Sequence, residues 1–385
     1  LQRPDMASSG IPMSGKVQFS AAGGDGVRLE LKRLASRVTV VLDRSRLDDN
    51  VDFHIAGVRV SLFVSFSIFA PYPTCMLLKV IALFMMPIIH INSVFNGVAG
   101  MGLIRFTADR ASIDQLCSVL YLFVPGVFML CMGFVLSNSS HNTPEKLAKR
   151  GFQLLLFGLI LNVFRGTLIY TIGGFLFKDN SMFLEAVCWL FGSDILYFAG
   201  LYLLLHAFLK KNGASDVVLL VVAAALQIIG TLLPPADTGN AILNAVIGNF
   251  VYSDKKSFFP FVWWMIYPVA GLFFRKGFDA AEKKSGFMLK CAAVCAAVFA
   301  LTSVTLLLLG HSVSEYLLWG QHDLTMRTPS MLLTLSFEGM YISLIYFISE
   351  PLHAPWLRTA VSAVAEKLNQ VYCIHWLLLM DGITV

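Results

Sequence analysis

The 385-residue sequence has few charged side chains, because Asp, Glu, Lys and Arg together make up only 14% of it. Hydrophobic residues make up 57%, and the mean hydropathy is +0.71. Soluble domains are about half apolar and about a quarter charged, so this chain has too little polar surface to cover its apolar mass in water. The composition excludes a single water-soluble globule and indicates a multi-pass membrane protein.

Metal-ligand and disulfide patterns are also lacking. Nearly all of the seven cysteines lie inside apolar runs, and no C-x-x-C pair or Cys/His cluster has the spacing of a metal site. The Gly-rich stretch 21–26 lacks the lysine of a phosphate-binding loop. No basic patch interleaved with aromatic residues indicates nucleic-acid binding. We therefore expect no metal and no nucleic-acid partner.

Residues 1–72 differ from the rest of the chain, since they begin with a polar segment and no signal peptide is visible in them. Two stretches, 37–43 and 51–60, alternate as β-strands do. The segment 13–60 resembles a piece of a fimbrillin-type β-sandwich subunit. Such subunits are exported, whereas the topology predicted below places the residues before 75 in the cytoplasm. The resemblance therefore favours a foreign or fused segment joined to 73–385. An ordinary cytoplasmic extension is the alternative.

From about residue 75, apolar runs of membrane-spanning length recur between short polar loops. Backbone groups in hydrocarbon need internal partners, so the spans are predicted to be helices. A further apolar piece, 240–251, is too short to cross and is expected to be interfacial or re-entrant. The sequence predicts an all-α polytopic bundle of nine helices, or ten if another is missing after residue 385. The predicted spans are 75–95, 117–137, 152–176, 184–209, 216–233, 257–274, 287–310, 330–349 and 368–385.

Lys and Arg are unequally divided between the two sets of loops. Four loops carry eleven of these residues, whereas the alternate four carry six. Cytoplasmic loops are richer in Lys and Arg, so the richer set is predicted to be cytoplasmic and the first span to run outward. The richer loops are 138–151, 210–215, 275–286 and 350–367.

The first span carries two ionisable residues, Lys79 and His90. They are about 16 Å apart along a helix, so Lys79 is expected at the cytoplasmic rim and His90 past the midplane. Pro87 between them is expected to kink the helix. A cation at the rim can hold phosphate groups, and a neutral imidazole can deprotonate a hydroxyl. The alternatives are a structural histidine and a lysine that anchors the helix at the interface.

Several stretches resemble the acyltransferase-3 family and its wider superfamily of transmembrane acyltransferases, which includes the heparan-glucosaminide N-acetyltransferase-like branch. Lys79-x10-His90 resembles the family's Arg-x10-His motif, with Lys in place of Arg. LFVPGVFMLCMGFVLS (122–137) resembles its second helix, in which Gly133 matches. Further similar stretches follow in order at 146–166, 194–205, 259–276 and 368–379.

The resemblance implies transfer of an acyl group, usually acetyl from acetyl-CoA, to a sugar hydroxyl or amine. It implies that His90 is catalytic and that Lys79 replaces the arginine on the donor side. Lys149 and Arg150, after the second helix, are then plausible phosphate contacts. Lys lacks the bidentate geometry of Arg and offers only a point charge.

Other polar residues within the predicted spans fit a cavity. Asn162 and Arg165 lie three residues apart on one helical face. Arg165 is expected to contact the donor or acceptor, or to pair with a carboxylate such as Asp194 or Glu338. Asp194 is otherwise a helix cap. Glu338 is the candidate to orient or charge-balance a histidine, with a structural ion pair as the alternative.

Two groups of residues are expected to be structural. His206 and His375 are predicted to be packing histidines. Trp263, Trp264 and Tyr267 are predicted to belong to an interfacial aromatic belt rather than to a stacking platform.

The sequence thus predicts a bacterial-type inner-membrane acyltransferase. It would move an acetyl group from acetyl-CoA to a hydroxyl of a cell-surface polysaccharide or glycan, or to a lipid-linked sugar. Its expected partners are the acyl-CoA donor, the acceptor and membrane lipids. A transporter or flippase of a glycan precursor, without acyl transfer, is the alternative, and a non-functional chimera is a third possibility.

Overall fold

The chain divides into two compact units, Leu1–Tyr72 and Pro73–Val385, and each is described here by itself. Side chains are described only from Thr74 onward, and not for 110–122. The computed structural model describes residues 17–21, 26–33, 36–43, 50–55, 58–63, 74, 77–87, 90, 110–137, 142–253, 256–317, 327–349, 359–361, 363–364, 372 and 374–375.

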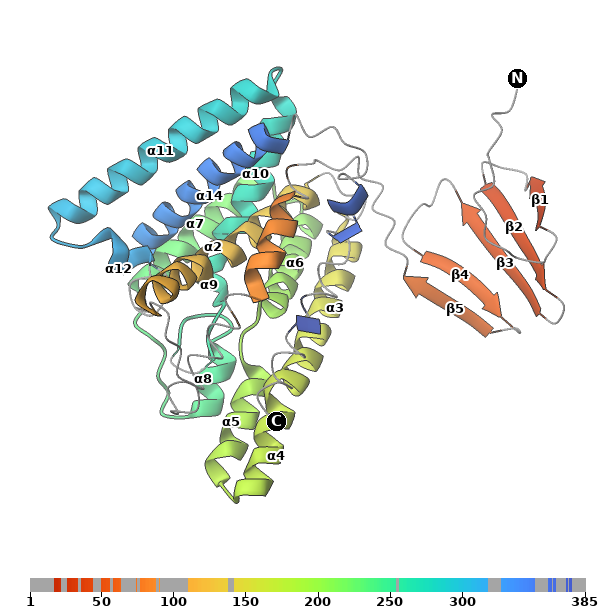
Figure 1. The fold of residues 1–385 in the computed structure, drawn as a ribbon, viewed down its shortest axis with the longest axis horizontal. Helices are drawn as coiled ribbons and strands as arrows, with labels where there is room; N and C mark the ends of the chain where they lie inside the picture. The colour runs from red at the N-terminus through yellow and green to blue at the C-terminus, as the bar shows by residue number, and fades with distance from the viewer. Residues whose placement is uncertain are drawn as a thin grey trace. The chain divides into compact units, whose positions relative to one another are not determined.

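The first unit contains a five-stranded sheet in which neighbouring strands are consecutive in the chain (Figure 1). All neighbouring pairs are antiparallel. The alternating stretches 37–43 and 51–60 fall in β3 and in β4 and β5. The strands are β1 (Val17–Ala21), β2 (Gly26–Arg33), β3 (Ser36–Asp43), β4 (Asn50–Ile55) and β5 (Val58–Phe63).

The second unit is a bundle of helices (Figure 1). It starts with the helix Leu77–Pro87. The elements that follow are α2 (Arg110–Leu136), α3 (Pro144–Asn162), the π-helical segment η2 (Val163–Thr167), α4 (Leu168–Phe177), α5 (Asn180–Phe191), α6 (Ile195–Lys211), α7 (Asp216–Leu232), α8 (Ala241–Ile247), α9 (Phe261–Trp264), α10 (Ile266–Ala280), α11 (Lys284–Leu308), α12 (Val313–Leu317) and α14 (Thr328–Ser349).

Four helices within the described residues are long and apolar enough to cross a membrane. This confirms the predicted membrane character and the helical bundle. Helices Leu77–Pro87, Phe123–Leu136 and Asp216–Leu232 are also apolar but shorter. The apolar piece 240–251 contains only the seven-residue α8. The four long helices are Pro144–Phe177, Asn180–Lys211, Lys284–Leu308 and Thr328–Ser349.

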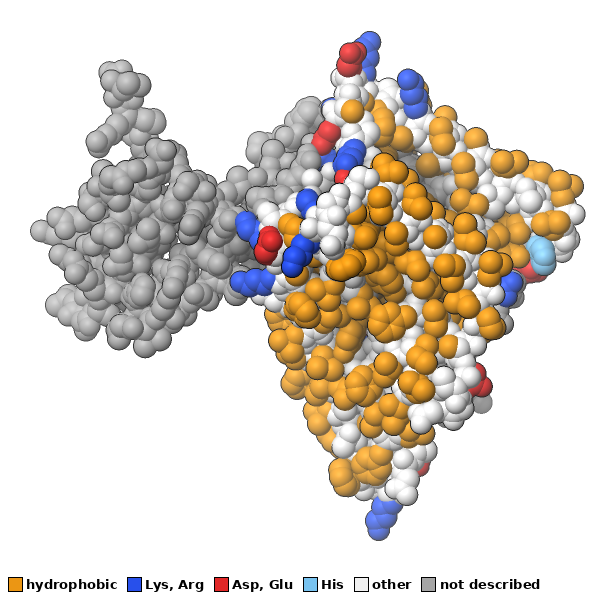
Figure 2. Space-filling view, turned by 180° about the vertical axis from the view of Figure 1, so that it is seen from behind, with side chains coloured by type: hydrophobic (Ala, Val, Ile, Leu, Met, Phe, Trp, Pro, Cys, Tyr) orange, Lys and Arg blue, Asp and Glu red, His pale blue; other side chains and the backbone are white. Residues whose placement is uncertain are grey.

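The outer surface of the bundle is apolar over a wide area, and Figure 2 shows hydrophobic side chains across most of one face. Such a surface is suited to contact with lipid rather than water. On α3, η2 and α4 the exposed apolar residues extend from Phe152 to Phe177, and on α11 from Leu289 to Leu308.

Three of the Lys- and Arg-rich loops lie together at one end of the bundle. Lys210 Nζ donates a hydrogen bond of 2.5 Å to the Asn142 carbonyl, which joins the end of α6 to the start of α3. Lys276 forms an ion pair with Asp216, which joins the end of α10 to the start of α7. The loops 138–151, 210–215 and 275–286 therefore share this end, which we call the basic end.

The end of α14 lies at the basic end as well. The ring of Tyr346 on α14 is 5.9 Å from that of Phe278 on α10. Ser349 also shares a hydrogen bond of 2.9 Å with Thr74, just before the helix Leu77–Pro87. The fourth Lys- and Arg-rich loop, which follows Ser349, thus starts at the basic end, and the first helix enters the bundle there.

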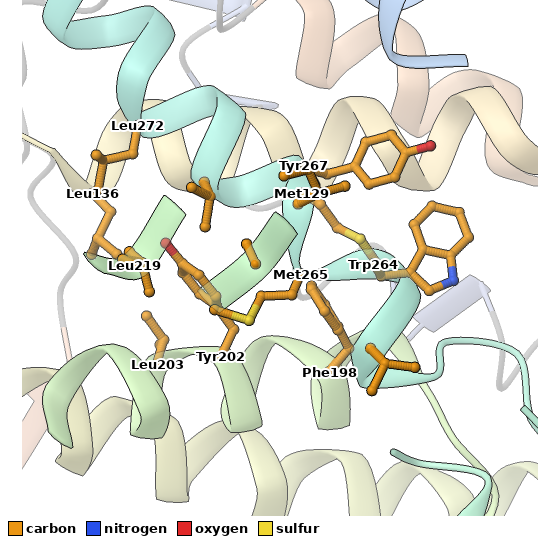
Figure 3. Packing of buried hydrophobic residues seen from close by; sticks show 14 of the residues in the cluster. Met129, Leu136, Phe198, Tyr202, Leu203, Leu219, Trp264, Met265, Tyr267 and Leu272 are labelled. Carbon is orange, nitrogen blue, oxygen red and sulfur yellow. The ribbon is translucent and has the colours of Figure 1, made fainter. Parts of the chain in front are cut away.

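The main core of the bundle lies among α2, α3, α6, α7, α9 and α10 (Figure 3). The predicted aromatic belt is wrong, because Trp263, Trp264 and Tyr267 are all buried in this core. Trp263 stacks on Tyr252 at 5.1 Å, and Trp264 lies 5.1 Å from Tyr267. A short break after Trp264 separates α9 from α10, and both indoles pack inward rather than toward lipid headgroups.

Glycines let α2 and α10 touch through their backbones. A Cβ added at Gly133 would lie 1.7 Å from the carbonyl oxygen of Pro268, and one added at Gly271 would lie 2.0 Å from that of Leu130. Small residues give this close approach between membrane helices. Gly133, singled out in the sequence as part of a family-like stretch, is therefore needed for packing.

We predict that Gly133→Ala lowers the free energy of unfolding by about 1–3 kcal/mol or more, because α2 and α10 would have to separate. The matched control is Gly286→Ala on α11, where the nearest atom to the added Cβ is 3.7 Å away. That change should raise stability by about 0.5–1 kcal/mol, since Ala is the better helix former. Thermal unfolding in detergent tests both changes, and an unaltered Gly133→Ala protein would contradict the packing described.

Candidate functional site

Two long helices of the bundle are interrupted next to each other. The helix Pro144–Phe177 contains the π-helical segment η2, which includes Arg165. The helix Asn180–Lys211 is broken after Phe191, and α6 restarts with Asp194 as its N-cap, whose side chain accepts a 2.9 Å hydrogen bond from the Leu196 backbone. Single π-helical turns are frequent at functional sites.

Arg165 and Asp194 form an ion pair between these two interruptions. Arg165 Nη1 lies 2.7 Å from Asp194 Oδ2, and the two side chains are only 3% and 1% exposed. Arg165 Nη2 also donates a 2.6 Å hydrogen bond to Asn162 Oδ1. Of the two carboxylates that the sequence offered to Arg165, the structure selects Asp194.

Two further hydrogen bonds hold the cluster together. Asn162 Nδ2 donates to the Gly192 carbonyl at 2.9 Å, which fixes η2 against the break between α5 and α6. Tyr372 Oη donates to Asp194 Oδ2 at 2.7 Å, from 178 residues farther along the chain. The Asp194 carboxylate therefore accepts from a cation, a hydroxyl and a backbone N–H at once.

Two histidines lie beside this ion pair. The His90 and His375 rings are 5.3 Å apart, and the Tyr372 ring is 5.3 Å from that of His375. His375 and Arg165 both interact electrostatically with His90. We call His90, Asn162, Arg165, Asp194, Tyr372 and His375 the polar cluster.

The polar cluster lies far from the ends of the apolar stripe on α3, η2 and α4. The exposed apolar stripe on α3, η2 and α4 runs from Phe152 to Phe177. Arg165 is about 20 Å along the helix from the first of these and about 18 Å from the second. Arg165 is thus far from either end of this stripe, and His90 lies within electrostatic range of Arg165.

Trp189 covers the polar cluster on the side away from the basic end. Arg165 Cζ lies 5.1 Å from the centre of the Trp189 ring, and Lys256 Nζ lies 4.6 Å from it. Lys256 also pairs with Glu185 at 3.1 Å. The indole packs on Gly166 of η2, where an added Cβ would lie 2.4 Å from the ring. The buried cation and the partly exposed one therefore both lie against the same aromatic ring.

The four cations predicted to bind the acyl donor do not lie together in the structure. Lys149 and Arg150 are exposed in the first turns of α3 at the basic end, and Lys79 is half-buried near the start of its helix. Arg165 lies about 22 Å along the helix from Arg150. Arg165 is thus part of the buried polar cluster, whereas the other three cations lie toward the basic end.

Glu338 lies apart from the contacts of the polar cluster. It is fully buried on α14, beside Gly126 of α2 and close to Tyr267 of α10. Within the described part of the chain, no hydrogen bond or ion pair joins it to a histidine. The predicted orienting contact with a histidine is therefore not found among these residues.

The positions of Tyr372 and His375 in the polar cluster were not predicted from the sequence, from which we expected His375 only to pack. They lie three residues apart, on one face of a helix, and this spacing was the available signal. His206, also expected to pack, is buried with its ring 5.8 Å from that of Tyr202. No group of three or more His, Cys, Asp or Glu among the described residues could hold a metal ion.

Comparison of the chain with family models, curated proteins and solved structures finds no match.

We predict that Asp194→Asn destabilises the protein by about 3–5 kcal/mol, because the Arg165 cation would remain buried without its counter-charge. Asn keeps the cap at the start of α6, since Asn and Asp cap helices equally well, so the change isolates the charge. Thermal unfolding measures the effect.

The matched control is Asp179→Asn. Asp179 caps α5 in the same way but is exposed, and hydrogen bonds from Ser181 lower the pKa of its carboxyl. Its substitution should leave stability nearly unchanged. Equal effects of the two substitutions would contradict a special role for the buried charge.

Proposed function

We propose that the helical unit is a membrane-bound acyltransferase, which moves an acetyl or other acyl group from acyl-CoA to a hydroxyl of a glycan. The observation that carries the proposal is the position of His90, beside His375 and within electrostatic range of Arg165. The resemblance of the Lys79–His90 helix to the acyltransferase-3 motif supports the same reaction. The protein would lie in a bacterial-type cytoplasmic membrane with the basic end inside.

In the proposed reaction His90 is the general base. Its imidazole takes the proton of the acceptor hydroxyl while that oxygen attacks the thioester carbonyl. The new C–O bond forms, the C–S bond breaks, and the leaving thiolate takes the proton back from the imidazole. Arg165, fixed by Asp194 and Asn162, supplies a preorganised positive charge for the oxygen that becomes negative in the transition state.

The cations nearer the basic end fit the phosphate groups of the donor. Lys149 and Arg150 are exposed there, and half-buried Lys79 lies between that end and His90. CoA carries its phosphates at one end and its thioester at the far end of a long arm. A donor held at the rim would thus present its thioester deeper in the bundle, where His90 lies.

We predict that His90→Ala lowers acceptor-dependent release of CoA by about 100-fold or more, the contribution expected of a general base. The assay uses the purified protein in liposomes with acetyl-CoA and a mixture of glycans. His206→Ala removes another buried histidine, outside the polar cluster, and should keep its activity. Undiminished release in His90→Ala would overturn the mechanism.

We predict that Lys79→Ala raises the KM for acetyl-CoA by roughly tenfold or more, because a charge-assisted contact to phosphate is lost. Lys79→Arg should lower the KM, since Arg binds phosphate with two parallel hydrogen bonds. Steady-state kinetics at saturating acceptor measure both. An equal loss of kcat in both variants would instead indicate a structural role.

The rival proposal, a transporter or flippase of a glycan precursor, makes a different prediction in the same liposomes. A transporter or flippase would move the glycan precursor across the liposome membrane without consuming acetyl-CoA.

A further inference from the structure

Glu338 carries a carboxyl group that is buried in the bundle, and no hydrogen bond or cation among the described residues offsets the cost of that burial. Its side chain is 0% exposed near the middle of α14, a helix long and apolar enough to cross the membrane. Neither of its two carboxyl oxygens has a hydrogen-bond partner among the described residues. Burying an ionisable group in such surroundings costs free energy, so such a group is a functional candidate by default.

The groups that face Glu338 offer no positive charge. Gly126 of α2 makes room for it, since a Cβ there would lie 1.9 Å from Glu338 Oε1. Tyr267 of α10 interacts with it electrostatically. From α11, Cys295 reaches the neighbouring Gly339. Within the described part of the chain, the titratable groups that these three helices place next to Glu338 and Gly339 are thus the Tyr267 phenol and the Cys295 thiol, and α14 itself adds the Tyr341 phenol one turn away.

A proton is the occupant that such a site accepts. An ionised carboxylate without a hydrogen bond or cation costs several kcal/mol in an apolar interior, and a bound proton removes that charge. A metal ion would need several oxygen or nitrogen ligands, and no such group is found among the described residues.

Buried hydroxyls follow one face of α14 from Glu338 toward the end opposite the basic end. Ser330, Thr334 and Glu338 are spaced by four residues and so share a face. Ser330 and Thr334 are 1% and 4% exposed, and Thr334 Oγ1 donates a hydrogen bond of 2.9 Å to the Ser330 carbonyl. Toward the basic end the next turns of this face carry Ile342 and Ile345, which are buried and apolar, and the buried Tyr346 lies beyond Ile342.

We propose that Glu338 is a proton-binding site inside the membrane, occupied at neutral pH and in exchange with the end of the bundle at which α14 starts, along Thr334 and Ser330. The site is separate from the proposed base His90. Its only ligand is a proton, so occupation forms one O–H bond on the carboxyl group and needs no other reactant.

Infrared spectroscopy of the protein in lipid at neutral pH tests the occupancy, because a protonated carboxyl has a C=O band separate from that of a carboxylate. We expect the band in the wild type and its loss in Glu338→Gln, which keeps the shape of the side chain without its acid group. Gly126→Ala should shift the band, since its Cβ displaces Oε1. Absence of the band in the wild type, or its persistence in Glu338→Gln, would overturn the proposal.

The path is tested by the rate at which the band shifts when the protein film is flushed with heavy water. Thr334→Val removes one hydroxyl from the face that bears Glu338 and should slow the shift severalfold. Ser343→Ala removes a hydroxyl of α14 that donates to the Gly339 carbonyl and should leave the rate unchanged. Equal rates in all three proteins would overturn the path. These spectra require no acyl donor, so their outcome is independent of the proposed acyl transfer.

Discussion

The buried ion pair of Arg165 and Asp194 is the constraint on which the middle of the bundle depends. Charges in a hydrocarbon layer persist only when they are paired and hydrogen-bonded. This pair therefore fixes η2, the break between α5 and α6, and Tyr372 relative to one another. Apolar helix faces can slide past each other at little cost, whereas a charged pair can be satisfied in only one register. The same register brings Arg165 within electrostatic range of His90.

Close backbone contacts provide the second constraint. Lipid tails are as apolar as leucine, so membrane helices gain little from simple hydrophobic burial against one another. Gly133 and Gly271 bring α2 against α10, and Gly151 and Gly200 bring α3 against α6 in the same reciprocal manner. In the second case a Cβ on either glycine would lie 2.9 Å from the carbonyl oxygen of the other. The helices that carry Arg165 and Asp194 thus approach closely on the side toward the basic end.

The sequence allowed the face of a residue on its helix to be predicted, but not the neighbouring helix. Apolar length predicted the four long helices, because the bilayer imposes it, whereas the other predicted spans are shorter helices or lie largely outside the described residues. Spacing placed Asn162 and Arg165 on one face, yet it left two carboxylates open as partners. The choice of Asp194 depends on where α6 restarts, and that is a property of packing. Trp263 was misplaced for the same reason, since a tryptophan near a predicted helix end can face lipid or core.

The polar cluster and Glu338 represent two different solutions to the burial of charge. In the cluster every charge has a counter-charge or a hydrogen bond, which fixes the groups in place. Glu338 has neither among the described residues, so a proton takes the place of a counter-charge. Acyl transfer moves its proton from a hydroxyl to a thiol and consumes none, so the proposed reaction needs no second proton site. Proton binding at Glu338 is therefore independent of the proposed acyl transfer.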